Sequence, residues 1–312
     1  MKKKIVALSM AACMAASVTA CGGSKPAETT AAATEAETEA TEAAAEESSA
    51  EETEAAAAAD IETVTPGKLT VATSPDFAPY EFYAIGEDGT PKLSGFDMDL
   101  AQYIADYLGL ELEVVTVDFD GVLSELQTKS VDLGMAGLSP DEKRMGIMDF
   151  SDLYYMGGQS LVTTKDNAEK FNSFEAVNKP DVSVGAQVGS IQMDLANENT
   201  PDADIVGLPK VTDIISELLT GKMNAAFIET DVAKSYQKNY PELELVMDVP
   251  YDAEGSAIGV CKDNASLLAG VNEAIAAAKE DGSLEKFIAD AGELAAGEKY
   301  EGLLDAEGNV QN

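Results

Sequence analysis

The chain of 312 residues contains no histidine and no tryptophan, and Arg144 is its only arginine. Without histidine, the sequence lacks the usual general base of enzymes and the commonest metal ligand of proteins. Catalytic triads that depend on histidine and zinc sites ligated by histidine are therefore excluded. Lysines provide all the other positive side chains, which makes the single guanidinium at position 144 a candidate for a specific role.

Cysteine is also scarce, with three residues in the whole chain. The amino-terminal stretch MKKKIVALSMAACMAASVTAC joins lysines to an apolar run shorter than the ~20 residues that span a bilayer, which is typical of an export signal. Its small residues before Cys21 resemble the lipobox of bacterial lipoproteins, and an ordinary signal peptide is the alternative. We predict a signal peptide at 1–21, acylation of Cys21 and no disulfide. Cys261, in the apolar run AIGVC, is then predicted to be a buried core residue.

Aromatic residues are absent from 22–65, where alanine, glutamate and threonine dominate and Lys25 is the only cation. Such a segment cannot bury enough apolar surface to offset the entropy of ordering it, so it is predicted to be a disordered tether, with a transient helix as the alternative. The whole chain has a formal net charge of −37. This charge excludes a role in binding nucleic-acid phosphates.

Strand-like and helix-like segments alternate from residue 66 onward, which predicts an α/β fold with helices packed on mostly parallel sheets. Asp97 is the expected cap of a helix that ends at Gly109. The pattern occurs twice and predicts two units, at 66–161 and 162–256. Two helices are predicted from their apolar faces, one with Leu100, Ala101, Ile104, Ala105 and Leu108, the other with Val211, Ile214, Ile215, Leu218 and Leu219.

The segment SPDEKR predicts the start of a helix, with Ser139 as N-cap, Pro140 at the first helical position and Glu142 three residues after the cap. Free N–H groups at a helix start favour an anion, and Arg144 lies one turn further along. A guanidinium can hold a carboxylate through two parallel hydrogen bonds. The residues alone leave a second interpretation open, an ion pair of Arg144 with Asp141 or Glu142.

The segment SGFDMDLAQYIADYL at 94–108 resembles the signature of solute-binding protein family 3, whose members deliver polar amino acids to ABC importers. The resemblance runs from about 68 to 290 and implies a type II periplasmic-binding-protein fold, an α/β fold of two lobes joined by two hinge strands. Hinges are expected near QSLVTTK and GSAIGVCK, with lobe 1 at 66–161 plus 257–312 and lobe 2 at 162–256. Other segments that carry the resemblance are SPDFAPYEF, DFDGVLSELQTKSVDLGMAGLSPDEKR, MDFSDLYY, GAQVGSIQ and GKMNAAFIETDVA.

The resemblance also implies an amino-acid site between the lobes. Arg144 and Ser139 are expected on the ligand carboxylate, facing Ser190, a predicted helix cap, and Ile191 after it. Glu229 and the carbonyl of Gly137 are expected on the ligand ammonium. The remaining ligand contacts are expected from Phe77, Phe119 and Gln187, whereas Tyr80 is expected to serve in packing.

The two polar positions Ser190 and Glu229 and the aromatic positions have alternatives or departures. Ser190 alone predicts no more than a capping serine, and Glu229 alone predicts a solvent-facing acid that opens a helix at Thr230. Aromatic side chains beside strands are more often core residues than ligand contacts. The family commonly has threonine at the position of Ser190, and many members have aspartate at that of Glu229.

The expected function is that of an extracytoplasmic lipoprotein that captures a polar amino acid and passes it to the membrane subunits of an ABC importer. We expect a monomer, anchored through Cys21 to the outer face of a Gram-positive membrane, with no catalysis, cofactor or metal. An enzyme on the same fold, such as a dehydratase, and a sensory module are the alternatives. The sequence leaves glutamine, glutamate, aspartate, arginine, lysine and cystine open as ligands.

Overall fold

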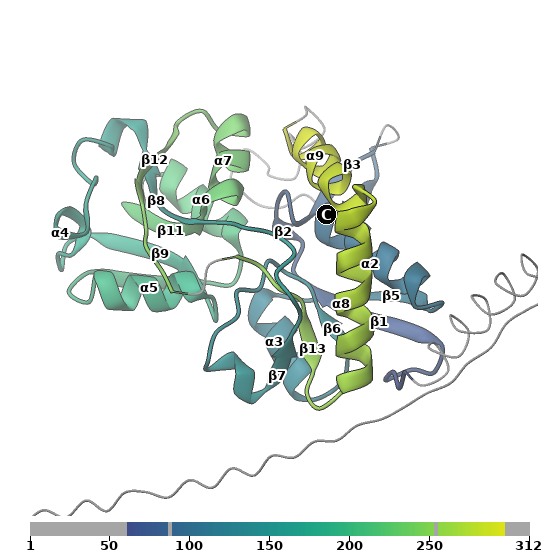
Figure 1. The fold of residues 1–312 in the computed structure, drawn as a ribbon. Helices are drawn as coiled ribbons and strands as arrows, with labels where there is room; N and C mark the ends of the chain where they lie inside the picture. Colours follow the sequence, from purple (N-terminus) through teal and green to yellow (C-terminus); the bar gives the residue numbers. More distant parts are fainter. Residues whose placement is uncertain (1–60, 87–88, 253–254, 297–312) are drawn as a thin grey trace, which may run out of the picture. The chain divides into compact units, whose positions relative to one another are not determined.

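The computed structural model describes residues 61–86, 89–252 and 255–296. These residues all belong to one compact unit, in which two α/β lobes are each built on a five-stranded sheet (Figure 1). The predicted α/β fold with two lobes is therefore confirmed. The predicted signal peptide at 1–21, with Cys21, and most of the predicted tether lie outside the described residues.

The sheet of the first lobe has three parallel strands followed by an antiparallel one. Strand β1 pairs in parallel with β5 and β6, and β13 pairs antiparallel with both β6 and β7. The strand order across the sheet is β5 (Glu111–Thr116), β1 (Lys68–Thr73), β6 (Leu133–Gly134), β13 (Gly259–Cys261) and β7 (Met148–Phe150). The helices of this lobe are α2 (Phe96–Tyr107), α3 (Phe119–Gln127), α8 (Ala265–Glu280) and α9 (Ser283–Ala295).

The sheet of the second lobe repeats this arrangement. Strand β9 pairs in parallel with β10 and β11, and β8 pairs antiparallel with both β11 and β12. The order is β10 (Asp204–Leu208), β9 (Ser183–Gln187), β11 (Ala225–Glu229), β8 (Gln159–Thr164) and β12 (Leu243–Asp248). Its helices are α4 (Phe174–Val177), α5 (Ile191–Asn199), α6 (Val211–Leu219) and α7 (Thr230–Asn239).

A small antiparallel sheet lies between β1 and α2 in the sequence of the first lobe. It consists of β2 (Asp76–Phe77), β3 (Glu81–Ile85) and β4 (Pro91–Ser94). Short 3₁₀ helices occur at Arg144–Gly146 and Lys165–Asn167. The small sheet matters for the site because it carries Phe77 and the neighbouring Asp76.

The chain passes between the two sheets twice, at 151–158 and at 249–258. Strand β8 pairs with β11 and β12 from Gln159 onward, so the predicted lobe boundary at 161 falls inside a strand and is wrong by a few residues. Residues 159–164 of QSLVTTK thus form a sheet strand, each paired with β11, with β12 or with both, and Lys165 begins a 3₁₀ helix. GSAIGVCK leads from the second crossing into β13, and a bridge between Tyr155 and Ser256 joins the two crossings.

The predicted helical faces are confirmed by burial. In α2, Leu100, Ala101, Ile104 and Ala105 are fully buried, and in α6 the buried set includes Val211, Ile214, Ile215 and Leu218. Both helices cover their sheets with these faces, since apolar residues spaced three and four apart lie on one side of a helix. Leu219, the last residue of the second predicted face, is partly buried against the same core.

The end of the predicted tether packs on the first lobe. The N–H of Val64 donates to Asp132 Oδ1 at 2.8 Å, and the side chain of Asn264 donates to the carbonyl of Glu62 at 2.7 Å. Ile61 contacts the apolar core. The prediction of a tether up to residue 65 is therefore wrong for its last five residues, 61–65, which have partners that the composition did not reveal.

Among the helices of the described segments, none combines the length and apolar character needed to cross a membrane.

Candidate ligand-binding site

Most predicted site residues lie at or just beyond the carboxyl ends of strands. Gln187 is the last residue of β9 and Glu229 the last of β11, and these two strands are parallel neighbours. In the first lobe, Gly137 and Ser139 follow β6, and Phe119 begins α3 after β5. This is the edge at which open α/β sheets bind ligands.

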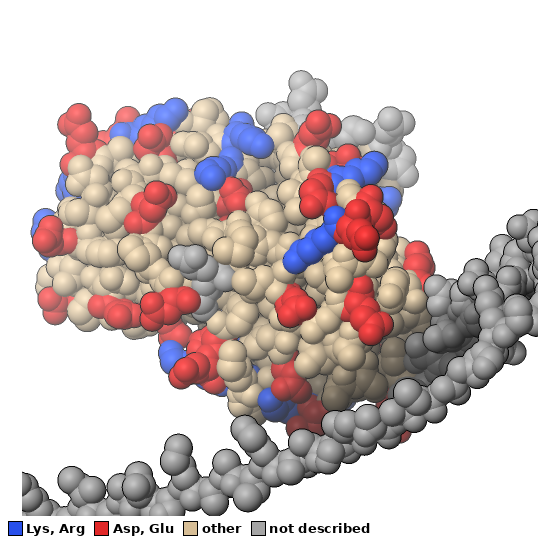
Figure 2. Space-filling model, viewed as in Figure 1, with Lys and Arg blue, Asp and Glu red and all other residues tan. Residues whose placement is uncertain are grey.

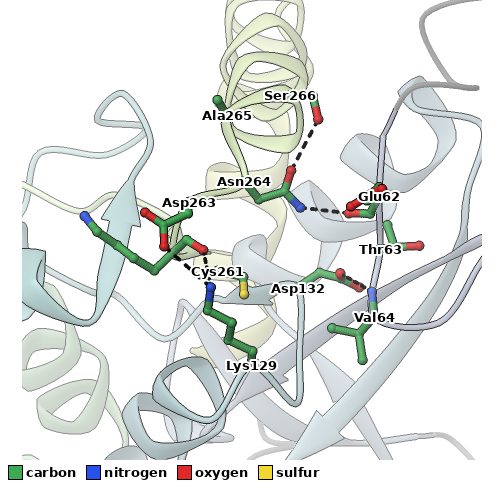
Figure 3. Close-up of a pocket in the computed structure, with 11 residues that line it drawn as sticks. Glu62, Thr63, Val64, Lys129, Asp132, Cys261, Asp263, Asn264, Ala265 and Ser266 are labelled. Carbon is green, nitrogen blue, oxygen red and sulfur yellow. Dashed lines mark hydrogen bonds and ion pairs between the residues drawn. The ribbon is translucent and has the colours of Figure 1, made fainter.

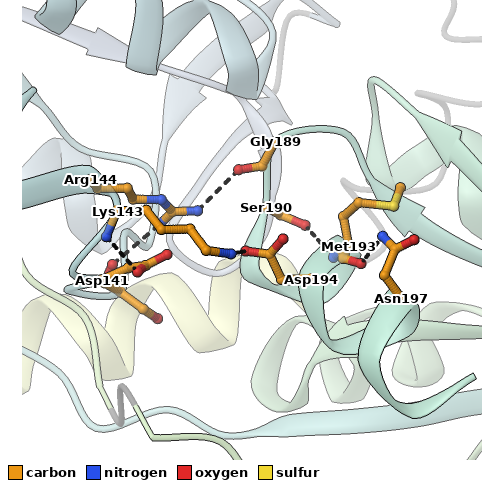
Figure 4. Close-up of polar contacts among 9 residues, drawn as sticks. Asp141, Lys143, Arg144, Gly189, Ser190, Met193, Asp194 and Asn197 are labelled. Atoms are coloured by element: carbon orange, nitrogen blue, oxygen red, sulfur yellow. Dashed lines mark hydrogen bonds and ion pairs between the residues drawn. The ribbon is translucent and has the colours of Figure 1, made fainter. Parts of the chain in front are cut away.

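Arg144 connects the two lobes through its guanidinium. Nη1 donates to the carbonyl of Ser139 at 3.2 Å, and Nη2 donates to the carbonyl of Gly189 in the second lobe at 3.1 Å (Figure 4). The guanidinium carbon lies 5.6 Å from the centre of the Phe119 ring, an arrangement that favours a cation. Beside it, the exposed ammonium of Lys143 reaches Asp194 of the second lobe at 2.7 Å.

The charge of Arg144 is buried without a matching acid among the described residues. Its side chain is 7% exposed, and none of the ion pairs found in the described part of the chain includes it. Burial lowers the pKa of the guanidinium, and the distant charges of Asp141 and Asp194 only partly oppose this. The alternative of an ion pair with Asp141 or Glu142 is therefore wrong. A buried cation with carbonyl partners alone is suited to receive an anion.

The predicted helix start at Ser139 is wrong. Instead, Asp141 organises a turn: its side chain accepts the N–H of Lys143 at 2.9 Å, and its carbonyl accepts those of Arg144 and Met145 at 3.0 Å each. A short 3₁₀ helix follows, with Lys143 at its N-cap position. The turn directs Arg144 toward the second lobe, where its guanidinium reaches the carbonyl of Gly189.

Ser190 caps α5 as predicted. Its Oγ accepts the N–H of Met193 at 3.2 Å and donates to the carbonyl of Gln187 at 2.7 Å, so the hydroxyl is fixed and buried. Ile191 is the first residue of this helix. Because Gly189 directly precedes the cap and bonds to Arg144, the guanidinium of one lobe lies beside the start of a helix in the other, which favours an anion at the same place.

Glu229 is 4% exposed, so the alternative of a solvent-facing acid is wrong. Oε2 accepts the N–H of Val232 at 2.8 Å and so caps α7, and Oε1 accepts the N–H of Gly158 at 3.3 Å. Burial raises the pKa of this carboxyl to about 7, although the two backbone N–H groups oppose the shift. In the described residues it has no cationic partner, which leaves it able to pair with a ligand ammonium.

The three candidate aromatics are all buried. Tyr80 is completely covered and lies 5.3 Å from Phe77 and 4.5 Å from Phe96, measured between ring centres, as expected of a packing residue. The Phe77 ring packs closely against Gly137. A Cβ added at this glycine would lie only 2.8 Å from the ring, so a larger residue does not fit there. Gly137 has φ of 57°, which also favours glycine at this position.

Asp97 has a different role from the predicted one. The N-cap position of α2 belongs to Gly95, and Asp97 lies in the first turn, fully buried. Its carboxylate accepts the hydroxyl of Tyr154 at 2.7 Å and the N–H of Gly137 at 3.2 Å, so it supports the loop that carries Gly137 and Ser139. No signal in the sequence indicated this supporting role, because Gly137 and Tyr154 are 40 and 57 residues away from Asp97.

Gln187 uses its side-chain amide inside the second lobe, where it donates to the carbonyl of Pro209 at 3.0 Å.

Cys261 is buried as predicted and keeps its thiol form, because burial raises its pKa. It lines a pocket of about 550 Å³ between Lys129, Asp132 and the start of α8, which contains none of the predicted ligand residues (Figure 3).

A buried guanidinium, a helix start and a buried acid, carried by two α/β lobes, are features typical of a protein that binds a small zwitterion. Residues 69–290 match the family of bacterial extracellular solute-binding proteins, family 3, and the chain belongs to this family.

Named relatives support this assignment. The arginine-binding extracellular protein ArtP of Bacillus subtilis is 33% identical over 70% of this chain and 84% of the relative. A crystal structure of the amino acid ABC transporter substrate-binding protein AbpA from Streptococcus pneumoniae, bound to L-arginine, is 34% identical with a TM-score of 0.71 and covers 74% of this chain and 97% of that one. The ancestral amino acid-binding protein AncCDT-1, a precursor of cyclohexadienyl dehydratase, is 33% identical with a TM-score of 0.64. The match covers 72% of this chain and 94% of that one.

Proposed function

We propose that this protein captures an amino acid between its lobes and delivers it to the membrane subunits of an ABC importer. The observation that carries the proposal is Arg144, a buried guanidinium that contacts both lobes but has no acid partner in the described residues. An α-carboxylate supplies the missing anion, and it accepts two parallel bonds from the guanidinium fork. A ligand held in this way stabilises the contact of the lobes, which is the signal for the importer.

Each predicted site residue has a role in this proposal. Arg144 and Ser139 bind the carboxylate from the first lobe, while Ser190 and Ile191 present the start of α5 to it from the second. Glu229 receives the ligand ammonium together with the carbonyl of Gly137. The ligand side chain is enclosed by Phe77, Phe119 and Gln187.

We propose a cationic amino acid as the ligand, with L-arginine first. The relatives ArtP and AbpA support this choice through the arginine named in their descriptions. The charge of the protein agrees, since a formal net charge of −37 favours the approach of a cationic ligand. Figure 2 shows acidic side chains spread among lysines over one face of the described body, without a continuous basic stripe on that face of the kind that binds nucleic acid.

An enzymatic role is less well supported than binding. Asp97 and Glu81 are both fully covered, so neither is open to a substrate as a general acid or base beside Glu229. Burial, and then the charge of Asp97, raise the pKa of Glu81 well above its usual range. We propose a monomeric binding protein without catalysis, cofactor or metal.

A thermal-shift screen with the twenty amino acids and cystine tests the proposed function. A ligand that binds only the folded state adds roughly 2.7 kcal/mol to the free energy of unfolding when present at a hundred times its Kd. We expect the largest upward shift of Tm with L-arginine, a smaller one with L-lysine and none with D-arginine. No shift with any amino acid at millimolar concentration contradicts the proposed function.

Cys21 is proposed as the lipid anchor, on the outer face of a Gram-positive cell membrane. Changing Cys21 to alanine should release the protein into the soluble fraction and leave its Kd for L-arginine unchanged, because the site lies in the described body. Cys261→Ala is the matched control and should remain with the membrane. Membrane fractionation with a salt wash measures both, and a Cys21→Ala protein that stays bound contradicts the anchor.

A further inference from the structure

Helix α6 begins without a cap of its own. Lys210 occupies its N-cap position and its side chain caps no N–H group. A lysine cannot accept a hydrogen bond, and its positive charge is unfavourable at the positive end of a helix. The start of α6 is also buried at Val211 and Thr212. The first N–H groups of the helix therefore need an acceptor from elsewhere, since water does not reach them freely.

The acceptor belongs to the other lobe. Asp76, in β2 of the first lobe, accepts the N–H of Val211 with its Oδ2. The hydroxyl of Ser74 donates to Oδ1 at 3.0 Å and holds the carboxylate in place. The backbone takes part as well, because the hydroxyl of Tyr236 in α7 donates to the carbonyl of Asp76 at 2.9 Å. One residue of the first lobe thus contacts two helices of the second.

The surroundings of Asp76 suit a charged carboxylate at neutral pH. Its side chain is 7% exposed, and burial raises its pKa to about 6. The N–H of Val211, the hydroxyl of Ser74 and the charge of Lys210 all oppose that shift, whereas Asp118 adds to it slightly. A negative charge at the start of α6 is favoured by the helix dipole.

We propose that Asp76 is a latch between the lobes, a positioning residue that caps α6 only when the lobes are in contact and so strengthens ligand binding without touching the ligand. This inference rests on the proposed function, because a latch matters only in a protein whose lobes close on a ligand. It differs from the Lys143–Asp194 pair, whose side chains are exposed and contribute little. When the lobes are apart, the N–H of Val211 loses its acceptor Asp76. The start of α6 is then uncapped, and this destabilises the open state relative to the closed one.

Changing Asp76 to alanine should weaken L-arginine binding by about tenfold, the upper part of the range for the loss of a helix cap. The loss should lie in faster dissociation, because the latch forms after the ligand has entered. L-Lysine should lose the same factor, since Asp76 does not touch the ligand side chain. Asp76→Asn keeps an acceptor oxygen of the same size and should lose less than about threefold.

A cap supplied by the helix itself removes the need for the latch. Lys210→Ser places a capping hydroxyl at the start of α6, which is then satisfied whether or not the lobes are in contact. In that background, Asp76→Ala should weaken binding by less than about threefold. Calorimetric titration of the four proteins completes the double-mutant cycle, and thermal unfolding without ligand shows whether each variant is folded.

Hydrogen exchange supplies a readout that does not depend on affinity. With saturating L-arginine, Asp76→Ala should speed the exchange of the amides at 211–213, and Lys210→Ser should restore their protection. The latch is overturned if Asp76→Ala binds within twofold of the wild type, if its loss is the same in both backgrounds, or if L-arginine and L-lysine lose different factors. None of these results affects the proposed function, which fails instead if the wild type binds no amino acid.

Discussion

Replacing Arg144 with alanine should weaken the binding of L-arginine by more than about a hundredfold. Each charge-assisted hydrogen bond to the ligand carboxylate contributes about 1.5–3 kcal/mol, so the loss of two costs at least ~3 kcal/mol. The free energy of unfolding should fall by less than the free energy of binding. In the wild type the buried guanidinium is desolvated without an acid partner in the described residues, so its removal relieves an unfavourable contribution. Isothermal titration of both proteins measures the difference.

Two further variants show whether charge or geometry matters. Arg144→Lys should recover only part of the affinity, since an ammonium keeps the charge but loses the paired bonds. Lys143→Ala is the matched control, because this neighbour also contacts the second lobe but through an exposed ion pair with Asp194. It should change Kd by no more than a few-fold.

The α-carboxylate itself can be tested with L-argininamide. This analogue should bind the wild type poorly and lose little more when Arg144 is changed, because the contact is already absent. If Arg144→Ala binds L-arginine within about threefold of the wild type, the guanidinium only supports the loops at Ser139 and Gly189, and the assignment of the carboxylate site fails.

Binding of L-arginine should weaken as the pH falls below about 7. Burial raises the pKa of Glu229 to about 7. A bound ammonium favours the carboxylate form and lowers that pKa, so binding below pH 7 must release a proton. The affinity should be highest just above pH 7 and fall by up to about tenfold per unit toward pH 5. Titrations from pH 5 to 7.5 keep the ligand ammonium protonated.

Glu229→Gln identifies the group responsible. Glutamine keeps an acceptor for the N–H of Val232 but cannot ionise, so binding should be weaker at pH 7.5 and its change between pH 7 and 6 should vanish. Asp76 and Asp97 have pKa values raised to about 6 by burial and give any smaller change that remains at lower pH. An unchanged pH profile in Glu229→Gln excludes Glu229 as the ammonium partner.

The elements with strong local patterns could be predicted from the sequence. The apolar face of α6 and the serine cap at Ser190 each depend on residues within one or two turns, and the structure has both. The boundary at β8 was misplaced because nothing in QSLVTTK distinguishes a strand that joins a sheet from one that links two lobes. That distinction depends on pairing with β11 and β12, which are far away in the sequence.

Side chains whose partners are distant were the harder part of the site. Ser139 and Asp97 both satisfy the rules for a helix cap, but neither caps a helix. Ser139 precedes a turn, and the carboxylate of Asp97 accepts hydrogen bonds from Gly137 and Tyr154. Asp76 carried no local signal at all, since the helix that it caps begins 135 residues later. The burial of Glu229, which decides its pKa, likewise depends on the whole lobe.

The antiparallel strand in each sheet has a consequence for the order in which the protein folds. The second lobe takes all its strands from one continuous stretch, β8 to β12, whereas the sheet of the first lobe needs β13 between β6 and β7. A chain that emerges from its amino end therefore has a complete second lobe while the first still lacks its fourth strand. The sheet of the first lobe can therefore be completed only once the carboxyl-terminal segment is available to it, whereas the sheet of the second lobe does not depend on that segment.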